Sequence, residues 1–398
     1  MVDTRQVQVA EGVYWVGAVD WNVRTFHGFT YTTPRGTTYN AYLILDDKIA
    51  LVDTVYAPFT NEMMSRIGTY VDPSKIDYVI ANHVETDHSG ALAAILSVAK
   101  NAKLVCDARC KDGLEKNYFG NWDYQIVKTG DTISLGKKTL SFIEAPMLHW
   151  PDSMFTYIPQ EELLLPNDAF GQHLASTERF AEDYDRAVLM EEAAKYYANI
   201  LMPLSPLVLK KIEEIGKLKL SIKTIAPSHG LIWRNPETII TAYTRWASGE
   251  SEKAVLVVYD TMWGATEKMA KAIVEGIVSE DVSAKLVRIA VSDRSEAVRD
   301  CLLMKGLVVG SSTINAGMLP TLSPFLEDLR GLKPRKKIGA AFGSHGWGGG
   351  GAKAVDKILR EMGVDVAADP VTVKYMPDQD ELRKCFELGA SVARRVKS

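Results

Sequence analysis

The feature of this sequence that most constrains its fold is a short run of potential metal ligands between two apolar segments. The run is HVETDHSG, residues 83–90; the apolar residues 78–81 precede it, and the Ala- and Leu-rich residues 91–98 follow it. This pattern predicts a strand, a tight turn and a helix, and such a turn exposes side chains at the carboxyl end of the strand. The run therefore predicts a metal site, with a solvated polar loop as the alternative. Its candidate ligands are His83, Glu85, Asp87 and His88.

The length and composition describe an ordinary globular protein with two domains. A chain of 398 residues exceeds what one hydrophobic core usually serves, and 46% hydrophobic with 24% charged residues is typical of soluble proteins. A formal net charge of −4 argues against a surface for nucleic acid or an anionic membrane. No apolar run reaches the ~18 residues of a membrane span, and the N-terminus lacks the apolar segment of a signal peptide. We therefore expect a cytoplasmic protein.

The cysteines do not form a recognisable metal or disulfide motif. Cys106 and Cys110 are too far apart for a C-x-x-C redox pair or an iron-binding knuckle of the rubredoxin type, and Cys301 and Cys385 are isolated. We expect no disulfide framework, which agrees with a cytoplasmic location. Any bound iron or zinc must therefore be held by histidines and carboxylates.

The chain divides into two regions with different patterns. Short β-branched and aromatic runs with interspersed helical segments predict an α/β sandwich with mixed sheets in the first region, where a long helical stretch runs from about residue 189 to 218. Residues 246–253 are polar and contain a glycine, as expected of a linker. Regular β–α alternation follows and predicts a doubly wound parallel sheet. We therefore predict domains at residues 1–250 and 251–398.

Three isolated donors at predicted strand ends extend the candidate metal site. His149, Asp168 and His229 each follow a strand-like run and are flanked by Pro or Gly, so backbone turns aim their side chains out of the sheet. A single histidine at such a place is most often structural. However, four of the chain's 7 histidines lie in these segments and in the opening run. Because a two-metal site needs about six to eight donors, the pattern favours a dinuclear site.

The second region contains a candidate anion site. Thr261, Gly264 and Thr266 lie between a buried strand and an amphipathic helix, where hydroxyl and backbone N–H groups suit a phosphate. The region has neither the G-x-x-x-x-G-K-[ST] loop of nucleoside triphosphate sites nor the G-x-G-x-x-G motif of dinucleotide sites. Two loops rich in small residues, 310–317 and 343–351, also follow predicted strands, where open α/β sheets bind ligands. Flexible turns are the alternative interpretation of these loops.

The order of the candidate ligands, H-x-[HE]-x-D-H followed by single H, D and H, resembles the metallo-β-lactamase fold, an αββα sandwich with a dinuclear site at its sheet edges. Asp53 matches the strand-end aspartate of that superfamily. Glu85 stands where zinc hydrolases of this fold carry histidine, and the added carboxylate makes the site harder and more anionic, which favours iron over zinc. The T-x-x-G-x-T spacing resembles the FMN phosphate loop of flavodoxins. Over nearly the whole chain, the sequence is thus similar to the flavodiiron proteins.

This resemblance implies the residues of two sites. His83, Glu85 and His149 would hold one iron ion; Asp87, His88 and His229 would hold the other, with Asp168 as the bridge, and His88 either ligates or swings away. His27, His173 and Tyr197 would donate protons or orient ligands around the centre, with core packing as an equal alternative. FMN would bind between three loops, with Trp263 or Trp347 beside its ring. The expected FMN residues are Thr261, Met262, Trp263, Gly264, Ala265, Thr266, Ser312, Thr313, Ile314, Asn315, Ser344, His345, Gly346, Trp347, Gly348, Gly349 and Gly350.

The same resemblance implies a flavodiiron oxidoreductase that reduces O2 to water, NO to N2O, or both. It also implies head-to-tail homodimers, or dimers of dimers, in which FMN of one subunit lies beside the diiron site of the other. No rubredoxin-like or flavin-reductase segment follows the second region, so we expect an external electron donor: a rubredoxin-type protein, or reduced coenzyme F420. A zinc hydrolase with an accessory flavodoxin domain, or a simple electron carrier whose sandwich domain binds no metal, are the alternatives.

Overall fold

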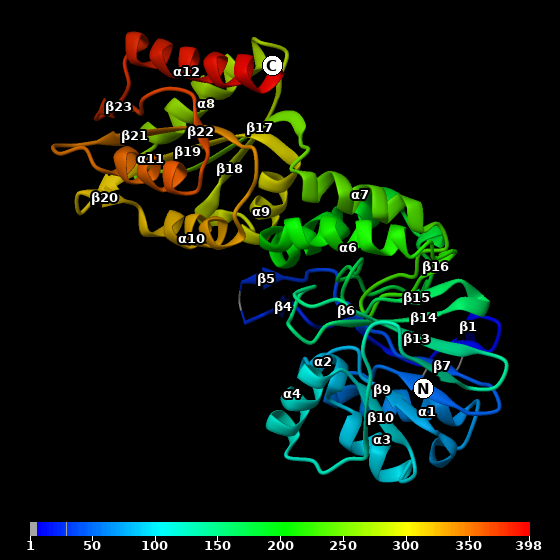
Figure 1. Cartoon of the computed structure of the whole chain (residues 1–398). Helices are drawn as coiled ribbons and strands as arrows, with labels where there is room; N and C mark the ends of the chain where they lie inside the picture. Colours follow the sequence, from blue (N-terminus) through cyan, green and yellow to red (C-terminus); the bar gives the residue numbers. More distant parts are fainter. Residues whose placement is uncertain (1–5, 29) are drawn as a thin grey trace. The chain divides into compact units, whose positions relative to one another are not determined.

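A computed structural model describes residues 6–28 and 30–398 (Figure 1). These residues cluster into two compact units. The first comprises the chain up to Phe26 with residues 33–196 and 206–244, and the second comprises residues 27–32, 197–205 and 245–398. The domain boundary at residue 250 stays a prediction, and two short segments from early in the chain join the second unit.

Two sheets form the centre of the first unit. A mixed sheet has the order β1-β2-β7-β8-β9-β10-β11, and a second sheet has the order β12-β13-β14-β15-β16. The short pair β3–β6 and strand β4 complete this unit, whereas β5 belongs to the second unit although it lies in this part of the sequence. The strands are β1 (Val7–Ala10), β2 (Val13–Trp15), β3 (Ala18–Asp20), β4 (Thr25–Phe26), β5 (Tyr31–Thr32), β6 (Thr37–Tyr39), β7 (Tyr42–Ile44), β8 (Ala50–Val52), β9 (Tyr78–Ile80), β10 (Lys103–Cys106), β11 (Tyr124–Ile126), β12 (Thr132–Ser134), β13 (Thr139–Glu144), β14 (Met154–Ile158), β15 (Leu163–Leu165) and β16 (Thr224–Ile225).

Strand alternation divides the apolar side chains of this unit between two layers. In β7, Tyr42 and Ile44 belong to the cluster that also contains Phe142 of the second sheet, whereas Leu43 belongs to the cluster packed under the helices. Helices α1, α3 and α4 cover that outer face of the first sheet (Figure 1). On the second sheet, Leu164 lines an apolar cavity together with side chains of α6 and α7. The unit is therefore an αββα sandwich, which confirms the predicted fold.

The helices of this region are mostly short. They are η1 (Ala57–Phe59), α1 (Thr60–Gly68), η2 (Pro73–Lys75), α2 (Thr86–Ser89), α3 (Leu92–Val98), α4 (Ala108–Tyr118), η3 (Pro159–Glu161), η4 (Ala181–Asp183), α5 (Arg186–Tyr196), the π-helical turn η5 (Tyr197–Leu201), η6 (Met202–Leu204), α6 (Ser205–Lys217) and α7 (Pro236–Ser248). The helical stretch predicted from about residue 189 to 218 is present, and it is divided into α5, η5, η6 and α6. Pro203 and Pro206 lack the N–H that a helix interior requires, so each begins a new helical segment.

The second unit is a doubly wound sheet, as predicted. Its main strands have the order β18-β17-β19-β21-β22 and run parallel, which is the flavodoxin order 2-1-3-4-5. In addition, β23 pairs in parallel with β21, and β20 pairs antiparallel with β19. The strands are β17 (Glu252–Asp260), β18 (Ser283–Arg288), β19 (Met304–Ile314), β20 (Gly317–Met318), β21 (Ile338–His345), β22 (Asp365–Val366) and β23 (Val371–Lys374).

Helices cover both faces of this sheet (Figure 1). The apolar stripe of α8, Met269, Ile273 and Ile277, packs with α12 against every second residue of β17. The helices are α8 (Ala265–Val278), η7 (Ile289–Val291), α9 (Arg294–Leu303), η8 (Pro320–Leu322), α10 (Ser323–Leu332), α11 (Gly351–Glu361) and α12 (Gln379–Lys397). None of the helices in the described part of the chain combines the length and apolar character needed to cross a bilayer.

Candidate metal centre and cofactor pocket

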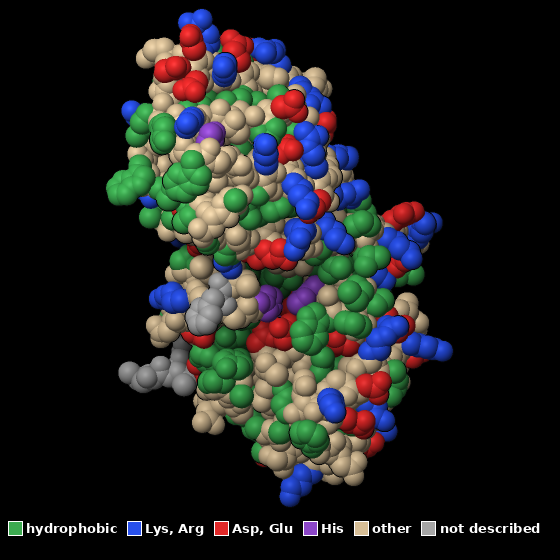
Figure 2. All heavy atoms as spheres, turned by 90° about the vertical axis from the view of Figure 1, so that its left-hand side faces the viewer, with side chains coloured by type: hydrophobic (Ala, Val, Ile, Leu, Met, Phe, Trp, Pro, Cys, Tyr) green, Lys and Arg blue, Asp and Glu red, His purple; other side chains and the backbone are tan. Residues whose placement is uncertain are grey.

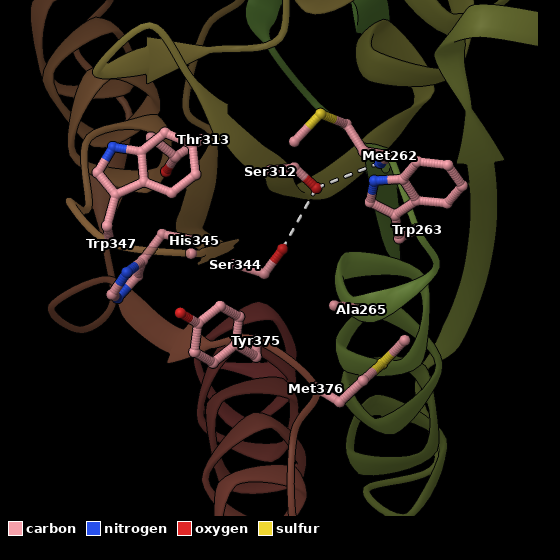
Figure 3. A pocket seen from close by; sticks show the side chains of 11 residues that line it. Met262, Trp263, Ala265, Ser312, Thr313, Ser344, His345, Trp347, Tyr375 and Met376 are labelled. Carbon is pink, nitrogen blue, oxygen red and sulfur yellow. Dashed lines mark hydrogen bonds between the residues drawn. The ribbon is translucent and has the colours of Figure 1, made fainter.

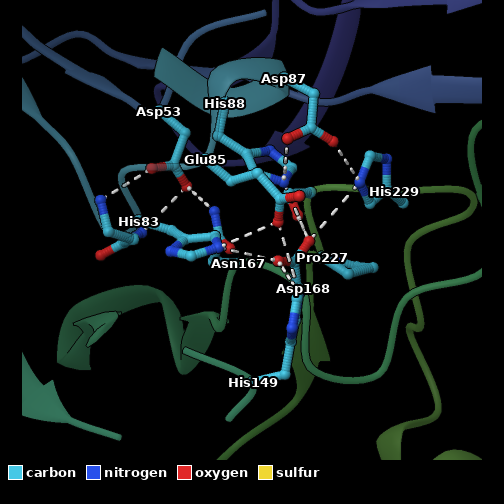
Figure 4. Close-up of polar contacts among 12 residues, drawn as sticks. Asp53, His83, Glu85, Asp87, His88, His149, Asn167, Asp168, Pro227 and His229 are labelled. Atoms are coloured by element: carbon cyan, nitrogen blue, oxygen red, sulfur yellow. Dashed lines mark hydrogen bonds and ion pairs between the residues drawn. The ribbon is translucent and has the colours of Figure 1, made fainter. Parts of the chain in front are cut away.

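Strand ends and one short helix bring the predicted metal ligands together. His83 follows β9, Glu85 is the residue that begins α2, and this helix carries Asp87 and His88. The remaining ligands follow strands of the second sheet or lie in the loop between two of them. These are His149 between β13 and β14, Asp168 after β15 and His229 after β16. Figure 4 shows their side chains pointing toward a common centre.

The ligand atoms form two groups that Asp168 connects. The atoms of His83, Glu85, His149 and Asp168 lie within 4.8 Å of one another, and so do those of Asp87, His88 and His229. Oδ2 of Asp168 lies 3.6 Å from His83 Nε2 and 3.3 Å from His149 Nε2. Its Oδ1 lies 3.0 Å from His88 Nε2 and 3.5 Å from His229 Nε2. One carboxylate oxygen thus faces each group, which is the arrangement that a bridge between two metal ions requires.

Buried atoms at this centre lack the partners that burial normally demands. Asp87 Oδ1, Asp168 Oδ2 and both ring nitrogens of His88 are buried without a hydrogen bond of suitable geometry. Such groups are costly unless something satisfies them. A set of imidazole nitrogens and carboxylate oxygens, with no thiolate, suits iron rather than a soft metal. The residues therefore fit a pair of iron ions.

The carboxylates at the centre attract positive charge. Burial opposes protonation of the His88 imidazole, but Asp87 and Asp168 outweigh it and raise the pKa of His88 to about 9. Burial also opposes protonation of His83, whose pKa is nevertheless raised well above its ordinary value by hydrogen bonds to Asp152 and Glu85. Bound metal cations would stabilise the charged carboxylates of the centre in the same way.

Supporting residues orient the imidazoles. Asp152 Oδ2 lies 2.9 Å from His83 Nδ1 and accepts a 2.7 Å hydrogen bond from the Val84 amide. The Thr38 carbonyl lies 2.6 Å from His229 Nδ1. Such contacts fix which ring nitrogen faces a metal. Asp152 was missed in the sequence, although it lies in the same Pro-containing segment as His149.

Asp53 supports the residues of the centre and is not in either group of ligand atoms. Its carboxylate accepts hydrogen bonds from the Asn82 amide at 2.8 Å, from Asn82 Nδ2 at 3.1 Å and from Asn167 Nδ2 at 3.2 Å. Asn82 and Asn167 immediately precede His83 and Asp168 (Figure 4). Asp53 therefore ties together the two strand ends that carry these ligands.

Of the three residues predicted around the ligands, His173 lies against them. Its ring centroid lies 4.8 Å from that of His229, and its Nδ1 lies 2.8 Å from Thr37 Oγ1. Tyr196 also packs here, with its ring 5.1 Å from His173 and 6.2 Å from His229. The sequence pointed to the next residue, Tyr197, because a helical pattern alone does not decide which of two adjacent tyrosines faces the centre.

Tyr197 and His27 belong to the second unit. The Tyr197 hydroxyl lies 2.8 Å from Ser205 Oγ, its ring packs 5.4 Å from that of Trp246, and burial raises its pKa to about 12. His27 is exposed, and its carbonyl accepts a 2.9 Å hydrogen bond from Thr30 Oγ1. The predicted roles of these two residues at the metal centre stay predictions.

The second unit contains a cavity of about 470 Å³ at the carboxyl ends of its strands (Figure 3). Most of the lining comes from the three loops singled out in the sequence. Tyr375 and Met376, which follow β23, were missed, although the rule that ligands lie at strand ends points to them too. The lining residues are Met262, Trp263, Ala265, Ser312, Thr313, Ser344, His345, Gly346, Trp347, Tyr375 and Met376.

Hydroxyl groups connect the loops at the floor of this cavity. Thr266 Oγ1 lies 2.8 Å from Ser312 Oγ and 2.9 Å from Ser344 Oγ, and Thr261 Oγ1 accepts a 3.0 Å hydrogen bond from the Gly264 amide. Eight of the predicted residues are not among those that line the cavity: Thr261, Gly264, Thr266, Ile314, Asn315, Gly348, Gly349 and Gly350.

The cavity has the features that FMN requires. Gly264 begins α8 without a side-chain cap, so the first amides of the helix are available to a phosphate. Trp263 and Trp347 are 86% and 93% exposed, which is unusual for large apolar side chains and suits contact with a flat aromatic ring. Figure 2 shows one face of the molecule, on which hydrophobic side chains gather in one area. In another area of the same face, histidines lie among acidic side chains.

Comparisons with known proteins agree with both sites. Residues 37–230 match the family described as "ODP family beta lactamase", and residues 257–389 match the flavodoxin family. A "Nitric oxide reductase" of Moorella thermoacetica is 52% identical over 99% of both chains. The "Anaerobic nitric oxide reductase flavorubredoxin" of Escherichia coli (strain K12) is 41% identical, over 98% of this chain and 82% of the relative.

Among solved structures, the rubredoxin oxygen:oxidoreductase of Desulfovibrio gigas superposes with a TM-score of 0.96 at 37% identity over 99% of both chains. The flavodiiron protein of Giardia intestinalis superposes with a TM-score of 0.95 at 35% identity, over 99% of this chain and 97% of that one. A β-lactamase-type metal domain joined to a flavodoxin domain thus defines the class of protein. This chain belongs to the flavodiiron protein family.

Proposed function

We propose that this protein is an oxidoreductase that reduces O2 to water, NO to N2O, or both, at a non-haem diiron centre supplied with electrons through FMN. The observation that carries the proposal is the position of Asp168, whose two oxygens face two groups of imidazole and carboxylate ligands. The relatives named nitric oxide reductase and rubredoxin oxygen:oxidoreductase support both substrates. Bound FMN supplies electrons singly, and bound iron supplies redox chemistry and open coordination positions for a diatomic.

The protein's own residues hold and shape the metal centre. His83, Glu85 and His149 would hold one ion, and Asp87, His88 and His229 the other, with Asp168 shared between them. Asp152 and the Thr38 carbonyl orient two of the imidazoles. His173, fixed by Thr37, lies beside His229, where its imidazole can hold a proton close to the centre.

In the second unit, we propose that the phosphate of FMN binds at the start of α8 and its ring binds beside the exposed Trp263 and Trp347. The uncapped helix start and the lining of the cavity support this placement. The hydroxyls of Thr266, Ser312 and Ser344 connect the three loops and so keep the cavity in shape. The remaining predicted residues of these loops are proposed to support it.

The electron donor and assembly are further parts of the proposal. A rubredoxin-type protein is the preferred donor, because the Desulfovibrio gigas relative is named for rubredoxin and the Escherichia coli relative is a flavorubredoxin. Reduced coenzyme F420 is the second choice. We also propose a cytoplasmic, head-to-tail homodimer or a dimer of dimers. Sedimentation analysis at micromolar concentration tests the assembly, and a monomer would contradict it.

Anaerobic quantification of metal and flavin, followed by O2 and NO consumption with a reduced rubredoxin, tests the function. We expect two iron ions and one FMN per chain, with consumption of at least one of the two gases. Glu85 argues against the zinc-hydrolase alternative, since it adds a carboxylate to the first group of ligands. Two zinc ions with lactam or thioester hydrolysis, and no gas consumption, would refute the reductase.

A further inference from the structure

Two short segments that cluster with the second unit each begin directly after an aromatic residue of the metal centre. Residues 27–32 follow Phe26, and residues 197–205 follow Tyr196. The ring of Phe26 stacks 4.1 Å from that of His173 and meets His229 edge-on at 5.6 Å. Tyr196 packs against the same two imidazoles. Each of the two aromatic residues is therefore joined by a peptide bond to a segment that belongs to the second unit.

A single residue at the start of α9 contacts both segments. The Thr32 amide donates a 3.2 Å hydrogen bond to Ser295 Oγ, and the two hydroxyls of this pair lie 3.0 Å apart. Asn199 Nδ2 donates a 3.0 Å hydrogen bond to the Ser295 carbonyl. The Thr32 hydroxyl also hydrogen-bonds the carboxylate of Asp293. We call Thr32, Asn199, Asp293 and Ser295 the α9 latch.

Asp293 stabilises the start of α9, where the residues of the α9 latch meet. It is the N-cap of α9, and its Oδ1 accepts hydrogen bonds from the Ser295 amide at 2.8 Å, the Ser295 hydroxyl at 2.7 Å and the Glu296 amide at 3.3 Å. Its Oδ2 accepts the hydrogen bond from the Thr32 hydroxyl. Ser295 is buried, so water does not compete freely for these bonds. The capped start of α9 thus offers both segments a fixed set of partners.

The second segment has an unusual backbone at the contact. Asn199 lies in the π-helical turn that follows α5, and this turn is where the chain leaves the helix that carries Tyr196. Isolated π-helical turns are rare and are found mostly at functional sites. The Asn199 side chain anchors the turn to α9.

We propose that Asp293 and Ser295 are positioning residues for the metal centre: through the α9 latch they fix Phe26 and Tyr196, which in turn hold the imidazoles of His173 and His229. The inference rests on the proposed function insofar as His229 is a metal ligand. It adds that residues of the flavodoxin-type unit, far along the sequence from every ligand, determine how firmly the metal is held. Orientation of ligand rings by their surroundings is a general determinant of metal affinity.

Substitutions of Thr32 distinguish a specific effect of the α9 latch from a general loss of stability. Thr32→Val keeps the β-branched shape and removes the hydroxyl that contacts Asp293 and Ser295, whereas Thr32→Ser restores a hydroxyl. Asp378→Asn is the matched control for Asp293→Asn, because Asp378 caps α12 of the same unit through a capping box and contacts neither segment. Metal release into a colorimetric chelator, flavin content and thermal midpoint are measured on each full-length protein.

We expect Thr32→Val and Asp293→Asn to release metal at least fivefold faster than the unaltered protein, with flavin content unchanged. Thr32→Ser should restore slow release, and Asp378→Asn should release metal at the original rate. Equal release from Thr32→Val and the unaltered protein would overturn the latch, as would equal acceleration by Asp378→Asn. Because release is measured for whichever metal is bound, a zinc-loaded protein would refute the proposed function while still testing the latch.

Discussion

Replacing Asp152 with asparagine tests how the first group of metal ligands is held. The carboxylate lies 2.9 Å from His83 Nδ1 and accepts the 2.7 Å hydrogen bond from Val84, so it fixes the orientation of the His83 ring. Asparagine keeps the shape of the side chain but removes its charge, and with it the charge-assisted part of both contacts. Changes to such supporting residues lower metal affinity about 10- to 100-fold, which corresponds to about 1.4 to 2.8 kcal/mol.

Chelator competition on the purified protein measures this loss ion by ion. We expect Asp152→Asn to weaken one ion by the stated factor and to leave the other ion, held by Asp87, His88 and His229, and the flavin content unchanged. Asp46→Asn is the matched control, because Asp46 also accepts backbone hydrogen bonds, from Asp47 at 2.9 Å and Lys138 at 2.6 Å. The reasoning is refuted if Asp152→Asn binds both ions normally, or if Asp46→Asn loses metal to the same extent.

Three further outcomes follow from the structure. Glu85→Ala or Asp168→Ala should abolish O2 and NO turnover while FMN stays bound; unchanged turnover, measured with a gas electrode, would instead favour a simple electron carrier. All cysteines are buried, and burial raises the pKa of Cys301 to about 11 and of Cys385 to about 12, so an aromatic disulfide reagent at pH 8 should label the protein only after unfolding. Burial lowers the pKa of Lys337 to about 8, so the unfolded chain binds this proton more readily. The contribution of Lys337 to stability should therefore rise by roughly 2 to 3 kcal/mol between pH 8 and 10, measured in urea as the difference between the unaltered protein and Lys337→Gln at each pH.

The sequence indicated which residues gather at the candidate metal centre, because these residues follow one local rule. His83, Asp168 and His229 each lie just beyond a buried apolar strand, so the positions of the strands determine the positions of the donors. Neighbouring strands then bring these ends to one edge of the sandwich. The spacing of residues along the sequence does not determine the direction in which each side chain points. That the two oxygens of Asp168 face different groups depends on the fold of two sheets together.

Other features of the centre depend on tertiary contacts that a local pattern does not contain. The helical pattern around residues 189–218 reveals neither the π-helical turn that begins at Tyr197 nor which of two adjacent tyrosines faces the centre. Tyr196, the last residue of α5, packs against His229. Asp152 was missed for a related reason, because its partner His83 is distant in the sequence and no local motif joins them.

The membership of residues 27–32 and 197–205 in the second unit bears on how such a protein can be divided or recombined. A gene cut after residue 250 would yield a flavodoxin fragment that lacks both segments and leaves Ser295 and Asp293 without Thr32 and Asn199. Replacing the second domain with another flavodoxin would also remove the partners of Thr32 and Asn199. The replacement would keep these contacts only if its helix equivalent to α9 carried matching side chains at its start. The two halves of this chain are therefore poorly interchangeable modules, and they are expected to have changed together during evolution.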